Sequence, residues 1–347
     1  MNSPLVDPAC TRMFREAAEA GAAVRMQLER NRAAVDTLGA ALRAFAPRAV
    51  VTCARGSSDH AATYAKYLIE TRLGVLTASA APSVTSIYGA RQDLSDCLFV
   101  AISQSGRSPD ILATTEAARK AGAMVVALVN DEASPLASAA DHALPLCAGE
   151  EKSVAATKSY IASLAGLAHL VAQWGSDKEL LDALARAPRD LERAWELDWR
   201  PAVDHLRNAS NLFVIARGVG LGIAQEAALK CKETCGLHAE SFSSAEVRHG
   251  PQALLQSGFP ALVFTQDDET REGIETLAGD LVARGVDVLL AGANVKGAVA
   301  LPTVSSHPAI EPLLLAQSFY RLANALAIAR GRDPDSPPHL SKITQTT

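Results

Sequence analysis

Residues 98–110 read Leu98-Phe99-Val100-Ala101-Ile102-Ser103-Gln104-Ser105-Gly106-Arg107-Ser108-Pro109-Asp110, and this stretch decides the fold of the 347-residue chain. Its first five residues are apolar and include β-branched members, which predicts a strand covered on both faces. Ser108 suits a helix N-cap, with Pro109 at the first helical position and Asp110 in the first turn. We therefore expect a buried strand, a short polar loop and the start of a helix.

The loop of this stretch is a candidate anion site. It offers the hydroxyls of Ser103, Ser105 and Ser108, the side-chain amide of Gln104 and the free backbone N–H groups of a helix N-terminus. Unpaired N–H donors and the helix dipole both favour negative charge. A serine-rich strand-to-helix turn also occurs without any ligand, and the loop alone leaves both interpretations open.

The composition is that of a globular chain with material for two cores. Apolar residues make up 48% of the chain and charged residues 20%, and its length exceeds what one core usually organises. A net charge of −5 and the lack of any Lys/Arg run longer than two argue against a nucleic-acid partner. The first residues show no secretory signal, and no run approaches the ~18 apolar residues of a membrane span. We expect a cytoplasmic protein.

The six cysteines do not follow the spacing of a disulfide framework. Cys53 and Cys97 lie in or beside predicted strands and are expected to be small buried side chains. Cys231 and Cys235 have i,i+4 spacing on a predicted helix, and no second Cys or His pair completes a zinc site. We therefore expect these cysteines to pack in the core, and we expect no metal.

Strands and helices alternate along the chain, and their order recurs. Ala54-Arg55-Gly56 matches Ala216-Arg217-Gly218, and the register holds to Leu73-Gly74 against Cys235-Gly236, an offset of 162. This pattern predicts an α/β protein made of two similar units with parallel sheets and helices on both faces. The expected division is a helical segment over 1–45, a first domain over 46–175, a helical linker over 176–205, a second domain over 206–330 and a tail over 331–347.

The second copy carries different chemistry at the equivalent loop. Where the first copy has residues 102–107, it has Thr265-Gln266-Asp267-Asp268-Glu269-Thr270, whose three carboxylates would repel a phosphate. We therefore expect only the first copy to bind an anion there.

Glu226, Lys230 and Glu233 have i, i+4 and i+7 spacing in the second copy, which places them on one helical face. Such a face is ordinarily a solvated set of ion pairs. Here the neighbours are Ala, Leu and Cys, so the face is expected to be half buried, where a carboxylate can serve as a base. His249, in a loop before Gly250, is a second candidate, although a single loop His is more often structural.

These residues resemble the sugar isomerase (SIS) double-domain family, namely the isomerase half of glucosamine-6-phosphate synthase and the stand-alone SIS-type glucosamine-6-phosphate deaminases. The resemblance covers the chain from about residue 20 to its end. The matching stretches are Gly56-Ser57-Ser58, Ser103 to Ser108, Val154-Ala155-Ala156-Thr157-Lys158, Glu226 to Glu233, His238-Ala239-Glu240, Glu246 to Pro251, Asp333 to Pro337 and Leu340-Ser341-Lys342.

The resemblance implies two tandem SIS domains, each a parallel-sheet αβα sandwich of flavodoxin-like type, and no cofactor. It implies that Glu233 is the base that moves a proton between carbons 2 and 1, and that His249 opens the sugar ring from a neighbouring subunit of a homodimer. Lys342 would approach the carbonyl, with which its amine could form a Schiff base. The implied binding residues are Ser58, Ser103, Gln104, Ser105 and Ser108 for the phosphate, with Val154 and Lys230 lining the pocket. Without the resemblance, the Pro-rich tail reads as a mobile terminus.

Two departures shape the expected function. Asn2 follows Met1, whereas the synthase has a glutaminase half with a cysteine at that position, and Arg107-Ser108-Pro109 is similar to the stand-alone deaminases. We expect a glucosamine-6-phosphate deaminase that forms fructose 6-phosphate and ammonia. Three alternatives stay open: a fructosamine- or galactosamine-type substrate, a glutamine-dependent transaminase with a separate glutaminase, and a non-catalytic sugar-phosphate sensor.

Overall fold

The computed structural model describes residues 7–342 of the chain. They form two compact units, each built on its own five-stranded sheet. The β1–β5 unit comprises residues 22–151, 158–188 and 341–342, and the β6–β10 unit comprises residues 7–21, 152–157 and 189–340.

The first sheet is parallel throughout, with the strand order β2-β1-β3-β4-β5. β3 (Cys97–Ser103) is buried at every position, and Val100 lies in register with Thr52 on one side and Val126 on the other. This confirms the expected strand covered on both faces. The other strands are β1 (Ala49–Cys53), β2 (Thr77–Ser79), β4 (Met124–Val129) and β5 (His142–Pro145).

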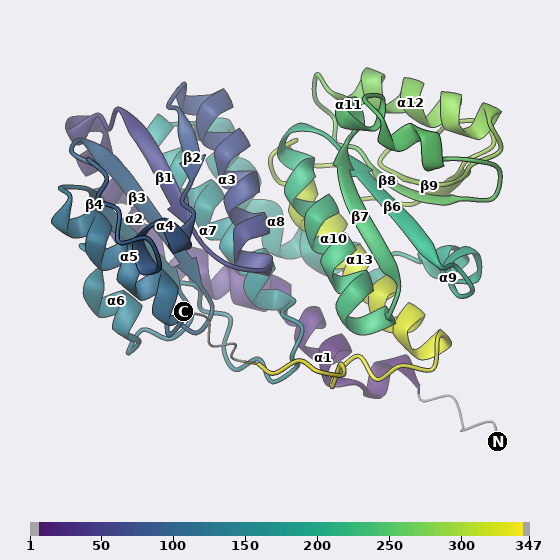
Figure 1. Cartoon of the computed structure of the whole chain (residues 1–347), viewed down its shortest axis with the longest axis horizontal. Helices are drawn as coiled ribbons and strands as arrows, with labels where there is room; N and C mark the ends of the chain where they lie inside the picture. Colours follow the sequence, from purple (N-terminus) through teal and green to yellow (C-terminus); the bar gives the residue numbers. More distant parts are fainter. Residues whose placement is uncertain (1–6, 343–347) are drawn as a thin grey trace. The chain divides into compact units, whose positions relative to one another are not determined.

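Helices cover both faces of this sheet (Figure 1). α3 (Ser57–Leu73) and α7 (Lys158–Gly175) lie on one face, and α4 (Pro82–Ser86), α5 (Pro109–Lys120) and α6 (Pro135–Ala139) lie on the other. α2 (Ala20–Phe45) runs along α7, where the Gln27 side chain donates to the carbonyl of Ala162 at 2.9 Å. Phe99, Ile111 and Val125 belong to the apolar core between the sheet and α5.

The second sheet repeats the arrangement, with all strands parallel in the order β7-β6-β8-β9-β10. Its strands are β6 (Asn211–Ala216), β7 (His238–Ser243), β8 (Pro260–Phe264), β9 (Asp287–Ala291) and β10 (Val299–Leu301). α10 (Leu221–Cys235) and α13 (Glu311–Ala329) lie on one face, and α11 (Ser244–Val247) and α12 (Arg271–Ala283) lie on the other (Figure 1).

Shorter segments complete the chain. α8 (Lys178–Glu196) contains the boundary between the units at Pro188, and α9 (Arg200–Leu206) precedes β6. α1 (Arg12–Ala18) packs against α13, where the Thr11 and Asn324 side chains are hydrogen-bonded at 2.7 Å. Three 3₁₀ turns are η1 (Pro8–Cys10), η2 (Gly218–Gly220) and η3 (Pro251–Leu254).

The predicted duplication is confirmed. Both sheets have the 2-1-3-4-5 order of flavodoxin-like folds. The glycines paired in the sequence also have the same role, because Gly74 and Gly236 end α3 and α10 in the left-handed conformation. Cys53, Cys97, Cys231 and Cys235 are buried, as expected.

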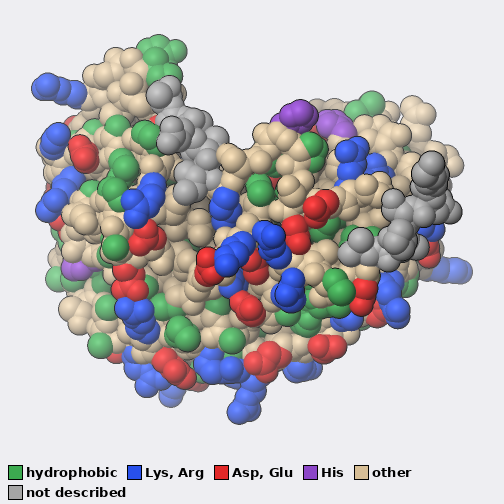
Figure 2. Space-filling model, turned by 90° about the horizontal axis from the view of Figure 1, so that it is seen from below, with side chains coloured by type: hydrophobic (Ala, Val, Ile, Leu, Met, Phe, Trp, Pro, Cys, Tyr) green, Lys and Arg blue, Asp and Glu red, His purple; other side chains and the backbone are tan. Residues whose placement is uncertain are grey.

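Among residues 7–342, no helix combines the length and the apolar character needed to cross a membrane. Figure 2 shows Lys and Arg side chains interspersed with Asp and Glu over the face that it displays. Such a mixture is typical of a solvated protein surface.

Gly106, in the loop after β3, provides a test of the fold. Its φ is +62°, and an added Cβ would lie 2.3 Å from Ser134 Oγ. We expect Gly106→Ala to lower the melting temperature clearly more than Gly89→Ala, because Gly89 has the same left-handed backbone (φ +59°) but open space around it. The control should cost only the left-handed strain of ~1–2 kcal/mol. Equal melting temperatures in a thermal melt would show that the close approach is unimportant.

Candidate functional site

The serine loop, residues 103–108, lies at the point where the order of the first sheet reverses. β1 and β3 are neighbours, and the helices that follow them, α3 and α5, leave toward opposite faces. Ligands of open α/β sheets bind outside the carboxyl ends of the strands at such a point. The structure therefore brings Ser58, in the first turn of α3, and the serine loop to adjacent strand ends.

The hydroxyls of the serine loop are bonded to its own backbone. Ser103 Oγ accepts a hydrogen bond from the N–H of Gly106 at 3.0 Å, and Ser105 Oγ accepts one from Arg107 at 3.4 Å. Ser108 is the N-cap of α5, as predicted, but its side chain makes no capping hydrogen bond. Gln104, Ser105 and Ser108 are half-buried, so their polar groups are within reach of a ligand.

An ion pair between an exposed arginine and a buried aspartate connects the two loops of the first sheet. Arg55, after β1, donates from Nε and Nη2 to Asp110 Oδ2 at 2.9 and 2.8 Å, and the Asp110 side chain is fully buried. Burial, reinforced by the Asp110 charge, raises the pKa of the Cys53 thiol to about 12, so this cysteine stays protonated. The sequence placed Asp110 at a helix start but did not indicate its partner Arg55.

The equivalent loop of the second sheet is closed by its own carboxylate. Asp268 Oδ1 accepts hydrogen bonds from the backbone N–H and the hydroxyl of Thr270 at 2.9 and 2.5 Å, and Oδ2 accepts one from Gln266 Nε2 at 2.8 Å. Asp267 pairs with Arg271 at 3.1 Å. The Asp268 carboxylate takes up donors of this loop, and its negative charge would repel an anion. This agrees with the expectation that only the first copy binds one.

Glu226, Lys230 and Glu233 form a connected cluster on α10. Lys230 Nζ lies 3.3 Å from Glu226 Oε1 and 2.5 Å from Glu233 Oε2, and Tyr320 on α13 donates its hydroxyl to Glu226 Oε1 at 2.9 Å. The Glu226 side chain is 0% exposed and that of Lys230 is 1%, whereas that of Glu233 is 21% exposed. Glu233 is therefore the member of the cluster that a ligand can reach.

The charge balance of this cluster is set by two opposing effects on Lys230. Burial alone would lower the pKa of its ammonium, but the nearby carboxylates of Glu226 and Glu233 outweigh burial and raise the pKa above its ordinary value. Lys230 is therefore charged at neutral pH, and one cation is shared by two carboxylates.

His249 follows α11 and is exposed. It lines a cavity of about 490 Å³ in the β6–β10 unit together with Arg217, Ser244 and Arg248. His249 thus has a loop position that places its side chain beside a cavity. Its delivery to a neighbouring subunit stays a prediction.

Lys342 makes an ion pair with Glu151 in the β1–β5 unit, with Nζ 3.2 Å from Oε2. The Glu151 side chain is 0% exposed and also accepts hydrogen bonds from the N–H and hydroxyl of Ser159 at 3.3 and 2.6 Å. Residue 342 is thus anchored by a buried carboxylate. Residues 343–347 lie outside the described part of the chain.

Val154 lies half-buried in the loop of residues 152–157, within the β6–β10 unit. Glu16 on α1 holds this loop by accepting hydrogen bonds from the N–H of Lys152 at 2.6 Å and the hydroxyl of Ser153 at 2.5 Å. The sequence did not single out Glu16. It did not single out Glu151 either, although only two residues separate Glu151 from the stretch that begins at Val154. This closeness was the one signal that the sequence offered.

Within residues 7–342 there is no group of three or more His, Cys, Asp or Glu side chains placed to share a metal ion. The structure thus gathers the predicted residues into local groups: Ser58 with the serine loop, Lys230 with Glu233, and Lys342 with Glu151. The chemical roles given to them stay predictions.

Comparison with known proteins identifies the family of this fold. The sequence model of the SIS domain matches residues 46–172 and 205–299. The chain belongs to the SIS domain family. Each of the two matches covers most of one five-stranded sheet.

Curated relatives of this SIS protein include isomerizing aminotransferases. Glutamine–fructose-6-phosphate aminotransferase (isomerizing) of Sulfurisphaera tokodaii is 32% identical over 298 residues, which cover 84% of this chain and 49% of that protein. The chain spans about half the length of the curated relatives it matches.

Solved structures agree with this assignment. A protein of Silicibacter pomeroyi DSS-3, provisionally described as a phosphosugar isomerase, has a TM-score of 0.90 at 44% identity, covering 94% of this chain and 100% of that one. The C-terminal domain of glucosamine-fructose-6-phosphate aminotransferase from Francisella tularensis has a TM-score of 0.85 at 25% identity, covering 94% and 98%. A glucosamine-6-phosphate deaminase from Thermotoga maritima shares the fold, with a TM-score of 0.77 at 22% identity over 97% and 100% of the two chains.

Replacing Lys230 tests the charge balance of the α10 cluster. Lys230→Leu leaves the buried Glu226 carboxylate uncompensated, which should destabilise the β6–β10 unit by ~3–5 kcal/mol. In a thermal melt at pH 7, we expect a lowered melting temperature, and we expect the double variant Lys230→Leu/Glu226→Gln to recover much of the loss.

The pH dependence of this variant follows from the same charges. The pKa of Lys230 in the folded wild-type protein lies above its ordinary value. The stability that this charged side chain contributes is therefore present at neutral pH, and it is lost only as the pH rises through the raised pKa. In Lys230→Leu the buried Glu226 carboxylate loses its cation and keeps a hydrogen bond from the neutral Tyr320 hydroxyl, so its pKa should rise and the loss of stability should shrink as the pH falls toward 5. A deficit that is independent of pH would rule out this explanation.

Proposed function

We propose that this SIS protein is an amino-sugar phosphate isomerase that deaminates glucosamine 6-phosphate. The observation that carries the proposal is the Lys230–Glu233 pair, in which a partly exposed carboxylate is held 2.5 Å from a buried ammonium. A side chain fixed in this way is suited to move a proton, because its position is set before the substrate arrives. The serine loop supports the phosphate part of the proposal.

The proposed reaction is a proton shift followed by hydrolysis. After ring opening, Glu233 removes the proton from carbon 2 of the open-chain sugar and returns it to carbon 1, which converts the amino aldehyde into a 2-imine. Water then adds to carbon 2 and ammonia leaves. Glucosamine 6-phosphate and water thus give fructose 6-phosphate and ammonia, and the shift needs only a base and a polarised carbonyl.

The other predicted residues have roles in this scheme. The hydroxyls and N–H groups of the serine loop bind the phosphate, since their present partners lie within the loop and can be exchanged for phosphate oxygens. Lys342 polarises the carbonyl. His249 assists ring opening in a neighbouring subunit of a homodimer, a role supported by its exposed position.

A second candidate is the isomerase part of a glutamine-dependent synthase. It is favoured by the names of the relatives at about 32% identity. The deaminase is favoured by Arg107-Ser108-Pro109, which resembles the loop of the stand-alone deaminases. A galactosamine- or fructosamine-type phosphate remains a third candidate, because the residues that select sugar stereochemistry are not identified.

Ammonia release separates the first two candidates. Purified protein given glucosamine 6-phosphate without glutamine should release ammonia and fructose 6-phosphate in equal amounts. Unphosphorylated glucosamine should not react, because binding through the phosphate positions the sugar. Absence of ammonia while the phosphosugar still raises the melting temperature would reject the deaminase and favour the synthase part, another amino sugar or a sensor.

Glu233→Gln tests the proposed base. We expect turnover to fall by roughly 10²–10⁴-fold or more, because the amide cannot accept the carbon-2 proton. Binding of glucosamine 6-phosphate, measured by calorimetry, should change little. Glu196→Gln, at an exposed glutamate of the same unit outside the matching stretches, is the control and should keep wild-type turnover. Parallel loss of binding and turnover in Glu233→Gln would contradict the role of a base.

A further inference from the structure

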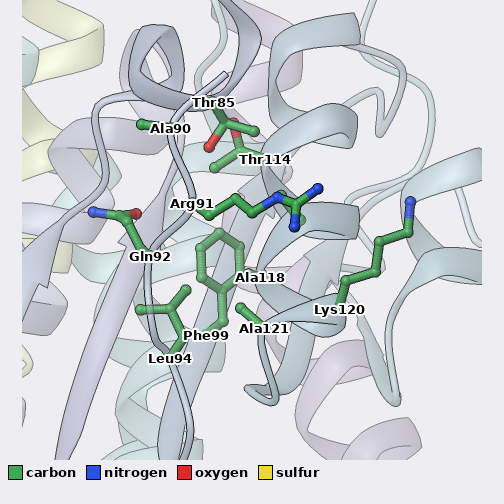
Figure 3. Close-up of a pocket in the computed structure, with 11 residues that line it drawn as sticks. Thr85, Ala90, Arg91, Gln92, Leu94, Phe99, Thr114, Ala118, Lys120 and Ala121 are labelled. Carbon is green, nitrogen blue, oxygen red and sulfur yellow. The ribbon is translucent and has the colours of Figure 1, made fainter. Parts of the chain in front are cut away.

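The β1–β5 unit contains a cavity of about 390 Å³ that the proposed reaction does not use (Figure 3). It lies between the loop that follows α4 and the last turns of α5. None of its lining residues belongs to the serine loop or to the loop after β1. Its size falls within the range of small-molecule sites.

The cavity has an apolar floor. Phe99 of β3, Leu94 of the loop and Ala117, Ala118 and Ala121 of α5 line it. In Figure 3 Ala118 and Ala121 lie beside the Phe99 ring. Such a floor accepts an aromatic ring or a short hydrocarbon chain, whose removal from water would drive binding.

The charges around the cavity have one sign. Arg91 and Lys120 are its charged lining residues, and no Asp or Glu lines it. Both are exposed, and within residues 7–342 neither makes an ion pair. In Figure 3 the guanidinium of Arg91 extends from the loop toward α5, and the ammonium of Lys120 lies on the α5 side.

We propose that this cavity binds an amphipathic organic anion, with an aromatic or aliphatic part against the partly exposed Leu94 and Ala117 and a carboxylate, sulfonate or phosphate at Arg91. The two unpaired cations favour an anion over a neutral or cationic molecule. The apolar floor favours an organic anion over inorganic phosphate. The site is independent of the proposed function, since it shares no residue with it.

Two fluorescent probes of similar shape and different charge test this proposal. They are 8-anilinonaphthalene-1-sulfonate, an aromatic anion, and N-phenyl-1-naphthylamine, which lacks the sulfonate. The wild-type protein should bind one sulfonate probe at this site, and Arg91→Glu should weaken that binding by about fivefold or more, because the charge reversal replaces attraction by repulsion. Binding of the neutral probe should change less.

Two further variants complete the design. Ala117→Phe fills the apolar part of the cavity and should weaken the binding of both probes. Arg119→Glu makes the same change of charge on α5 outside the cavity, where Arg119 pairs with Asp141 at 3.2 Å, and should leave both probes unaffected. Saturating glucosamine 6-phosphate should not displace the sulfonate probe.

The outcomes separate this site from other apolar surfaces and from the proposed function. Equal binding of the sulfonate probe by wild type and Arg91→Glu would overturn the proposal, as would equal weakening by Arg119→Glu. Displacement by the sugar phosphate would place the probe elsewhere and also overturn it. Melting curves show whether each variant is folded, and Arg91→Glu keeps the test valid if Ala117→Phe does not fold.

Discussion

The first strand of each unit lies inside its sheet and not at an edge, and the rest of the structure depends on this strand order. β1 and β6 come first in the sequence of their sheets. The next strand in the chain pairs with them on one side, and the remaining three strands lie on the other side. The helices after the two central strands must then leave toward opposite faces, so the loops that lead into them diverge. The serine loop, the Arg55–Asp110 pair and the Asp268 loop all occupy the position that this topology creates.

The two similar units allow equivalent positions to be compared. With the offset of 162, the buried cluster residues Glu226 and Lys230 correspond to Tyr64 and Leu68, which are also buried. An apolar leucine therefore satisfies this position in one copy, while the other carries a lysine held by two carboxylates. Buried ion pairs are seldom more stable than apolar residues of similar size. This comparison supports the proposal that the cluster takes part in the reaction.

Much of the architecture could be predicted from local patterns. The run from Leu98 to Asp110 contains its own strand, loop, cap and helix start, and the repeat of Ala-Arg-Gly motifs identifies two equivalent units. The helical spacing of Glu226, Lys230 and Glu233 was enough to place them together. The hydrogen-bonding state of Ser108 was not predictable, because a residue can take the N-cap backbone position without using its side chain.

Contacts between segments that are far apart in the chain could not be predicted from the sequence. Tyr320 donates a hydrogen bond to Glu226, which is 94 positions away in the sequence. Lys342 donates one to Glu151, which is 191 positions away. Neither partner is indicated by spacing, since only the packing of α13 on α10 and the path of the tail bring them together. Glu16 is a similar case, because one helical glutamate among many gives no sign that it will hold a loop.

The tail has a consequence for the order in which the chain folds. Asp335 accepts hydrogen bonds from the N–H groups of Arg12 and Met13, both at 2.8 Å, and so caps the start of α1. A ribosome makes α1 before the β1–β5 unit, whereas the packing partner α13 and the capping Asp335 follow that unit in the chain. Most of the β1–β5 unit is complete by residue 188 and can fold during synthesis. The β6–β10 unit can complete its packing around α1 only after α13 and Asp335 have been made.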